Sequence, residues 1–319
     1  MVSYIARRIL QAIPILLGMS IIVFAIVHIA PGSPVDRFRS PRVSADQIAS
    51  LIQRYGLNKP LIEQYIAWIT SFVQVWRPDS WGYSFLDGQP VIKTFLARAP
   101  ATLLLTGCAL LATIVFAIPI GVLAAVKQYS WTDKIINTLA TIGYAMPSFL
   151  LGTYILFIGG VYLGWFPLFG MQTLGHKNDY LDIGWHLVLP VTSLAIQGIA
   201  AWARYMRASM LDVLHQDYIR TARAKGLPGR TVIGKHALRN ALIPIVTLLG
   251  LTVPTLIAGA AITEFIFTWP GLGQTFISSV GTRDYPMVLA LTMVGGFAVI
   301  LGNLIADVLY GVVDPRIKY

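Results

Sequence analysis

The chain has 319 residues, of which 56% are hydrophobic and 12% are charged, and its mean hydropathy is +0.68. A soluble globular domain carries roughly 25% charged residues, so this composition excludes a soluble protein. The apolar residues form runs long enough to cross a bilayer, so the net charge of +10 indicates a cytoplasmic excess of Lys and Arg rather than a nucleic-acid-binding surface.

The first apolar run covers residues 9–30 and follows Arg7 and Arg8. It is longer than the apolar core of a signal peptide, which predicts an uncleaved span that stays in the membrane. Residues 1–30 therefore form the first unit of the chain, with a cytoplasmic start.

A long segment at 31–100 separates this span from the next and predicts two short helices outside the membrane. Ser44 and Gly56 mark the ends of the first helix, and Pro60 opens the second. The second helix has an apolar face of Leu61, Tyr65, Trp68, Ile69 and Phe72. Two interpretations stay open for this face: a small cap packed on the spans, or a docking platform for a partner protein.

Residues 101–319 form the third unit, with five further spans and a basic loop at 204–240. The apolar runs place these spans at 101–126, 135–163, 184–203, 241–263 and 287–313. The sequence therefore predicts an all-helical integral membrane protein with six transmembrane helices.

Short connections decide the orientation, because Lys and Arg near span ends face the cytoplasm. One side carries Arg7, Arg8, Lys127, Lys134, the eight basic residues from Arg204 to Arg239, Arg316 and Lys318, whereas the opposite short loops carry Lys177 and Arg283. We expect both termini in the cytoplasm and the segment 31–100 outside it.

The basic loop predicts a helix of about three turns over 212–225, since no Pro or Gly interrupts it. Gly226 ends this helix in a left-handed cap, and Pro228 follows. One face of the helix can hold Val213, Tyr218, Thr221 and Ala222, which leaves Arg220, Arg223 and Lys225 on other faces. The cations alone could hold anionic lipid, at about 1 kcal/mol each.

Catalytic and nucleotide-binding signals are weak. The stretch "GRTVIGKH" at 229–236 nearly fits a phosphate-binding loop, but His236 stands where the pattern needs Ser or Thr, and no strand precedes it. Cys108 is the single cysteine, and the five histidines show no ligand spacing on one helix. We expect no metal, cofactor or enzymatic site in this chain.

The stretch "DYIRTARAKGL" at 217–227, followed by "HALRNALIPIV" at 236–246, resembles the cytoplasmic coupling loop of ATP-binding-cassette importer permeases of the dipeptide, oligopeptide and nickel branch. The resemblance covers nearly the whole chain. The stretches "YGLNKPLIEQYIAW", "EFIFTWPGLG" and "DVLYGVVDPRIKY" are similar to the first of the two permease subunits in such systems.

The resemblance implies that a short coupling helix sits in a cleft of an ATPase subunit. Arg220, Thr221 and Ala222 occupy the family's Glu-Ala-Ala triplet and Gly226 its glycine, so the acidic residue is absent here. Contacts with the ATPase would come from Val213, Tyr218, Thr221, Ala222 and Ala224. The full set of candidate coupling residues is Val213, Asp217, Tyr218, Arg220, Thr221, Ala222, Arg223, Ala224, Lys225 and Gly226.

The resemblance also implies the assembly. This chain would form half of a pathway for short peptides in a bacterial or archaeal plasma membrane. A second homologous permease, two ATPases that bind ATP and magnesium, an extracytoplasmic substrate-binding protein and membrane lipid would be its partners. The competing interpretation is an ion- or proton-coupled transporter or channel that acts alone. Such a protein needs buried titratable groups near mid-membrane, whereas Glu264 and Asp307 lie near predicted span ends.

The segment "EFIFTWPGLG" follows the fifth predicted span and breaks its helix at the outer surface. The resemblance places this turn near the pathway mouth and the docked binding protein. The candidate residues are Glu264, Trp269, Pro270, Gly271 and Gly273. An ordinary interfacial turn anchored by Trp269 explains the same residues.

Overall fold

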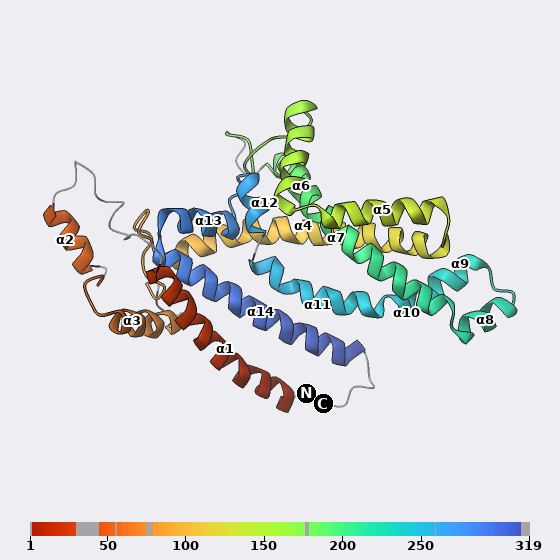
Figure 1. Cartoon of the computed structure of the whole chain (residues 1–319), viewed down its shortest axis with the longest axis horizontal. Helices are drawn as coiled ribbons and strands as arrows, with labels where there is room; N and C mark the ends of the chain where they lie inside the picture. Colours follow the sequence, from red (N-terminus) through yellow and green to blue (C-terminus); the bar gives the residue numbers. More distant parts are fainter. Residues whose placement is uncertain are drawn as a thin grey trace.

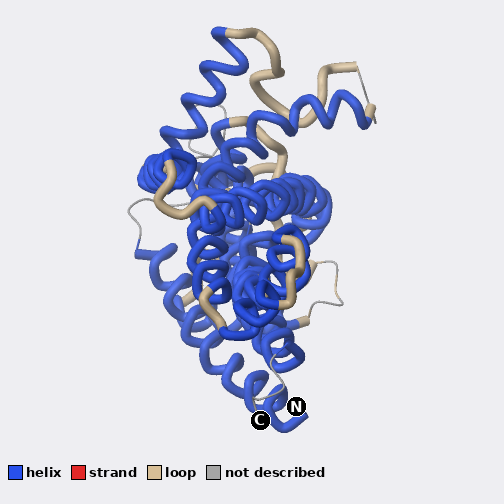
Figure 2. Tube along the Cα trace, turned by 90° about the vertical axis from the view of Figure 1, so that its right-hand side faces the viewer, coloured by secondary structure: helices blue, strands red, loops and turns tan. Residues whose placement is uncertain are grey.

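A computed structural model describes residues 2–29, 45–54, 56–74, 77, 79–175, 179–258 and 260–313. These residues are almost entirely helical and contain no strand, only an isolated bridge between Tyr83 and Pro90, as Figure 2 shows. The prediction of an all-helical chain is confirmed for this part. The predicted helix start at Ser44 and the cations Lys177, Arg316 and Lys318 lie outside the described residues.

Five helical stretches are long and apolar enough to cross a membrane, or six if one bent pair counts as a span. They are Ala6–Ile29 in α1 (Val2–Ile29), α4 (Val91–Val126), α7 (Tyr180–Leu214), Gly229–Gly250 and Tyr285–Ile305 in α14 (Tyr285–Val313). The chain is therefore a multi-pass membrane protein, and α4 starts earlier than residue 101, the predicted start of the second span.

The third predicted span, 135–163, is sharply bent. It consists of α5 (Trp131–Ala145) and a second stretch, Ser148–Tyr162, which are bent by 106° relative to each other. Pro147 lies at the bend and has no N–H, and it forces Met146 out of the helical conformation, to a ψ of 126°. The Gln197 side chain donates a hydrogen bond of 2.8 Å to the Met146 carbonyl, which satisfies it at the break.

The remaining elements are short. The second stretch of the bent pair is α6 (Ser148–Ile155) and a π-helical turn, η2 (Leu156–Tyr162). The basic loop holds α8 (Asp217–Ala224), α9 (Gly229–Thr231), a second π-helical turn η3 (Val232–Ala237) and α10 (Leu238–Ala241). The fifth predicted span, 241–263, is divided between α11 (Ile243–Ala258) and α12 (Ala261–Ile266), and α13 (Leu272–Thr282) precedes α14.

The long helices lie side by side in two connected pairs (Figure 1). α4 packs along α7, and α11 packs along α14. α1 lies against α14 on the side opposite to α11. The start of α1 and the end of α14 are joined by an ion pair of 2.9 Å between Arg8 and Asp307. These two helix ends therefore lie at the same level.

Within the described residues between α1 and α4, α3 (Leu61–Val73) and the stretch 79–90 form a cap on α1 and α14. α2 (Ala45–Arg54) precedes α3. Trp68 of α3 stacks on Phe24 of α1 with ring centroids 5.8 Å apart, and the Tyr65 hydroxyl lies 2.8 Å from that of Ser20. The apolar face of α3 thus packs on the chain's own helices, in favour of the cap interpretation.

Glycines allow α4 and α7 to approach each other closely. A Cβ at Gly121 would lie 2.6 Å from the Cβ of Met206, and a Cβ at Gly198 would lie 2.5 Å from the Thr113 hydroxyl oxygen. Both distances are below any van der Waals contact, so only glycine fits. Small residues at helix crossings are the usual means by which membrane helices pack.

We expect Gly121→Ala to destabilise the protein by about 1–3 kcal/mol through overpacking, although alanine favours a helix. The melting temperature in mild detergent should fall. Gly107→Ala in the same helix is the matched control, because a Cβ there meets nothing within 4 Å. Equal melting temperatures for the two variants would contradict the close contact.

Candidate docking site

The basic loop folds into a compact unit beyond the end of α7. α7 ends at Leu214, and Gln216 is extended, with a φ of −73° and a ψ of 149°. The eight-residue helix α8 then starts at Asp217. The predicted helix over 212–225 was therefore too long at its start, because Asp212 and Val213 belong to α7.

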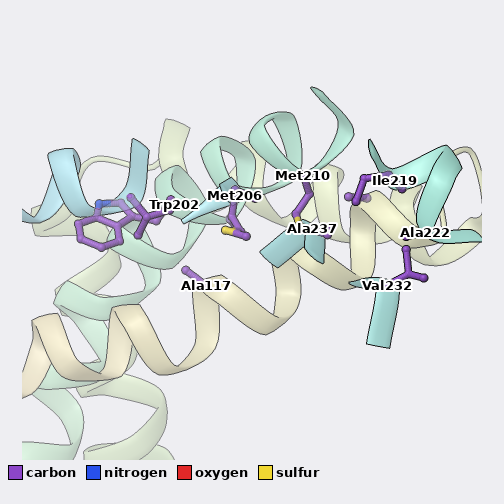
Figure 3. Packing of buried hydrophobic residues seen from close by; sticks show 12 residues of the cluster. Ala117, Trp202, Met206, Met210, Ile219, Ala222, Val232 and Ala237 are labelled. Carbon is purple, nitrogen blue, oxygen red and sulfur yellow. The ribbon is translucent and has the colours of Figure 1, made fainter. Parts of the chain in front are cut away.

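Burial of one face of α8 explains the break before it. Ile219 is fully buried and Ala222 nearly so, in a cluster with Met210 of α7 and with Val232 and Ala237 of η3 (Figure 3). A helix that continued straight from α7 would carry Ile219 away from this cluster. Burying an isoleucine side chain stabilises by about 1.5–3 kcal/mol, so the chain turns.

The opposite face of α8 is open to solvent. The side chains of Asp217 and Arg220 are 98% and 82% exposed, and their mutual distance of 3.8 Å makes only a weak ion pair. Thr221, Arg223, Ala224 and Lys225 are exposed as well. Tyr218 is 43% exposed, and its hydroxyl accepts a hydrogen bond of 2.8 Å from the Asn240 side chain, which fixes its ring at the rim of this face.

Gly226 ends this unit as predicted, with a left-handed φ of +72°. Its N–H donates to the Arg223 carbonyl at 3.0 Å, so a carbonyl at the end of α8 is satisfied. A Cβ at Gly226 would meet nothing within 4 Å inside the chain. Among the described residues, no neighbouring atom requires a small residue at this position, and only the left-handed φ favours glycine.

Two residues differ from the expected pattern of partner contacts. Ala222 is buried and Val213 half-buried, and both pack against the chain's own core. Ala222 therefore holds α8 in place, and Val213 presents only part of its side chain to solvent. Tyr218, Thr221 and Ala224 remain available for contact.

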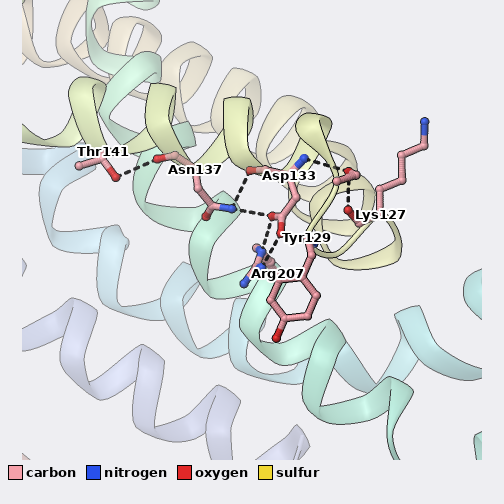
Figure 4. Close-up of polar contacts among 7 residues, drawn as sticks. Lys127, Tyr129, Asp133, Asn137, Thr141 and Arg207 are labelled. Atoms are coloured by element: carbon pink, nitrogen blue, oxygen red, sulfur yellow. Dashed lines mark hydrogen bonds and ion pairs between the residues drawn. The ribbon is translucent and has the colours of Figure 1, made fainter.

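An ion pair that sequence analysis missed braces this end of the molecule. Arg207 of α7 donates two hydrogen bonds of 2.7 Å to the two oxygens of Asp133, which also accept from Asn137 and from the Tyr129 N–H (Figure 4). The Asp133 side chain is nearly buried. The stretch "SWTD" at 130–133 is a helix-capping pattern that could have pointed to Asp133, because Ser130 caps α5.

The second candidate site is the turn between α12 and α13. Glu264 is fully buried, and its carboxylate accepts hydrogen bonds of 2.8 Å from the Thr102 hydroxyl and 3.0 Å from the Gln274 N–H. The Thr102 oxygen also accepts from the Leu272 N–H at 2.7 Å. Burial raises the pKa of the Glu264 carboxyl, and these hydrogen bonds oppose the shift.

The rest of this turn is packed against α4. Trp269 is fully buried, and its indole N–H donates to the Ala101 carbonyl at 2.8 Å. A Cβ at Gly271 would lie 2.4 Å from a Glu264 oxygen, and one at Gly273 would lie 2.4 Å from the Ala261 Cα. Glu264, Trp269 and both glycines are buried, so of the five candidate residues Pro270 alone is partly exposed.

Neither site has the donor set of a metal centre. Among the residues that the structure describes, no three His, Cys, Asp or Glu side chains lie close enough together to hold a metal ion.

Two family models together match almost the whole chain. Residues 117–319 match the family described as binding-protein-dependent transport system inner membrane component, and residues 1–106 match the N-terminal region of such components. The chain is 45% identical to the oligopeptide transport system permease protein AppB of Bacillus subtilis, with 100% of each chain covered.

Two further relatives match over the whole chain. The identity is 38% to the di/tripeptide transport system permease protein DppB of Pseudomonas aeruginosa, with 99% of that protein covered, and 37% to the glutathione transport system permease protein GsiC of Shigella flexneri, with 100% covered. A solved structure of the inward-facing MetNI methionine transporter shares the fold, with a TM-score of 0.54 and 18% identity over 70% of this chain and 98% of that chain.

Removing the Thr102 hydroxyl tests the support of the 264–273 turn. We expect Thr102→Val to lower the melting temperature in detergent and to speed hydrogen exchange at 264–274, because each buried group left unpaired costs about 1–3 kcal/mol. Thr102→Ser keeps the hydroxyl and should behave as the unmodified protein.

Thr192→Val is the control, since Thr192 is exposed and bonds only its own helix, at Val188. An equal effect of Thr192→Val and Thr102→Val would show that the carboxylate network contributes nothing.

Proposed function

This chain belongs to the family of binding-protein-dependent transport system inner membrane components, and from that membership we propose that it is the first of two permease subunits in an ATP-binding-cassette importer of short peptides. The observation that carries the proposal is similarity along the full length to a protein named as an oligopeptide permease, at 45% identity. Other full-length relatives are named for dipeptides, tripeptides and glutathione, which are all short peptides.

The chain serves as a translocation subunit, and ATP hydrolysis takes place on ATPase partners. In our proposal, α8 is the helix that transmits movement from an ATPase subunit to the membrane spans. The support comes from its two faces: Ile219 ties α8 to α7 and η3, whereas Tyr218, Arg220, Thr221 and Ala224 are available to a partner. A firmly seated helix can transmit a displacement of its exposed face to the core that holds it.

A transporter driven by protons or ions is not favoured by the buried acids. Glu264 is held by Thr102 and by backbone N–H groups of the turn that it supports, which gives it a structural task. Asp307 lies 2.9 Å from Arg8. Among the residues that the structure describes, neither carboxylate lies in a cluster of three or more His, Cys, Asp or Glu side chains. A proton relay requires a chain of titratable groups.

We propose that both termini and α8 face the cytoplasm. The ion pair between Arg8 and Asp307 supports termini on one side, since it holds the start of α1 beside the end of α14. The exposed cations of α8 support the cytoplasm as that side, because Lys and Arg accumulate there. The cap between α1 and α4 would then face the substrate-binding protein.

Gly226→Asp tests the coupling role of α8. We expect this variant to insert and fold but to lose bound ATPase subunits and peptide uptake. A Cβ at Gly226 would meet nothing within 4 Å, and Asp is among the residues that tolerate a left-handed φ such as the +72° found here. The measurements are co-purification of partner subunits, followed by mass spectrometry, and uptake of a labelled dipeptide in cells. Recovery of a second permease in the same sample would support the heterodimer.

Gly164→Asp is the matched control, since Gly164 is exposed, has a left-handed φ of +64°, and a Cβ there would also meet nothing within 4 Å. Normal ATPase recovery and uptake with Gly226→Asp would contradict the role of α8.

Cysteine labelling tests the orientation. Cys108 is the single native cysteine, so Cys108→Ala provides a clean background. On intact cells, a membrane-impermeant maleimide should label Asp87→Cys, in the cap, and should reach Arg220→Cys, on α8, only after the membrane is opened; both native side chains are exposed. The reverse pattern would overturn the orientation.

A further inference from the structure

A cavity of about 430 Å³ lies between the cap and the helices that it covers. Its walls come from the outer end of α1, the turn between α2 and α3, one side of α3, the segment 80–85 and the start of α14. This volume is within the range of roughly 300–1,000 Å³ that is typical of small-molecule sites. The coupling helix and the 264–273 turn use none of these residues.

Three hydrogen-bond donors in these walls have no partner among the described residues. They are the indole N–H groups of Trp68 and Trp81 and the hydroxyl of Ser80, and all three atoms are closed off from solvent. Buried donors are nearly always paired, so three orphans around one cavity indicate a missing acceptor. Most of the other buried polar side chains that the structure describes do have partners.

The chemistry of the walls restricts the ligand. Phe24, Trp68 and Trp81 belong to a run of stacked and tilted rings that also includes Phe72. Among the described residues, the lining contains no Asp or Glu, and the exposed cation Lys59 lies at it. These walls suit a ligand with an apolar or aromatic part and with a group that carries a negative charge or several acceptor lone pairs.

We propose that this cavity binds a small amphiphilic carboxylate, whose apolar body packs on the rings and whose carboxylate accepts hydrogen bonds from Trp68, Trp81 and Ser80. A carboxylate has about four lone-pair sites, enough for three donors, whereas a single carbonyl has two. Because all three donor atoms are closed off from solvent in this conformation, the two Trp side chains and the Ser80 hydroxyl reorient on binding, as side chains at binding surfaces commonly do.

Two sources could supply this chemistry: the C-terminal carboxylate of a short peptide with an apolar side chain, or a fatty acid from the outer leaflet. The proposal does not depend on the cargo of the transporter, because either ligand would bind between the cap and the ends of α1 and α14.

Photo-crosslinking tests the site in the full-length protein, purified with its partners into lipid nanodiscs. The probe is a twelve-carbon carboxylic acid with a diazirine at its far end, and the matched control probe is the amine of the same length. We expect the acid to label residues within 53–85 and 285–289, as mapped by mass spectrometry, and the amine to leave these segments unlabelled. Equal labelling by the two probes would overturn the proposal.

Competition distinguishes the sources. Loss of labelling with unlabelled dodecanoate but not with the dipeptide Leu-Phe supports a fatty acid, and loss with Leu-Phe supports a peptide carboxylate. Labelling that neither compound reduces would show that the probe reacts from the bilayer without a site, against the proposal.

Variants test the three donors. Trp81→Phe keeps the ring that contacts Phe72 and Phe95 and removes the N–H, and Ser80→Ala removes the hydroxyl. Each variant should raise the probe concentration for half-maximal labelling about tenfold.

Trp165→Phe is the control, because its indole is exposed and lies outside the cavity, and it should leave this concentration unchanged. Unchanged labelling in both donor variants would contradict the carboxylate contact, and the acid-against-amine comparison remains decisive if a variant fails to fold.

Discussion

The close contact between α4 and α7 is the constraint on which the rest of the structure depends. Gly121 and Gly198 let the two backbones approach where any side chain would collide. In a bilayer, apolar side chains gain little by leaving lipid, so tight backbone packing has to hold helices together. Both candidate sites are attached to this pair: α8 continues from the end of α7, and the 264–273 turn is bonded to Thr102 and Ala101 of α4.

Two breaks in the helices are each stabilised by a side chain of α7: Gln197 donates to the Met146 carbonyl at the 106° bend, and Ser209 donates to the Ala241 carbonyl beside the basic loop. Trp269 of the 264–273 turn donates to the Ala101 carbonyl of α4 in the same way. A backbone group without a partner is costly where water is absent. These bonds therefore allow irregular backbone inside a membrane protein without loss of stability.

Charge is divided between structural and exposed roles. Arg207 forms a bidentate pair with the nearly buried Asp133, and this pair fixes the start of α5 against α7. Arg220, Arg223 and Lys225 are exposed on α8 and at its end, and α8 follows α7, the helix that carries Arg207. The Arg207–Asp133 ion pair stabilises this end of the molecule. The exposed cations of α8 give it a charged surface that a partner can reach.

The sequence by itself determined the membrane class, the approximate spans, the two helices between α1 and α4 and the glycine cap of α8. Each of these depends on local composition or on spacing along one segment, such as the apolar run of α1 or Gly226 behind α8. The family resemblance was also readable from short stretches, above all 217–227.

Only the tertiary structure decided where α8 begins, that Ala222 faces inward, that Glu264 is buried and that a cavity lies under the cap. These features arise from residues far apart in the chain: Thr102 and Glu264 are 162 positions apart, and Ser84 bonds Asp284 across 200. Periodicity within one helix shows that a face is apolar, but whether that face meets the chain's own core, lipid or a partner depends on which distant segment packs against it.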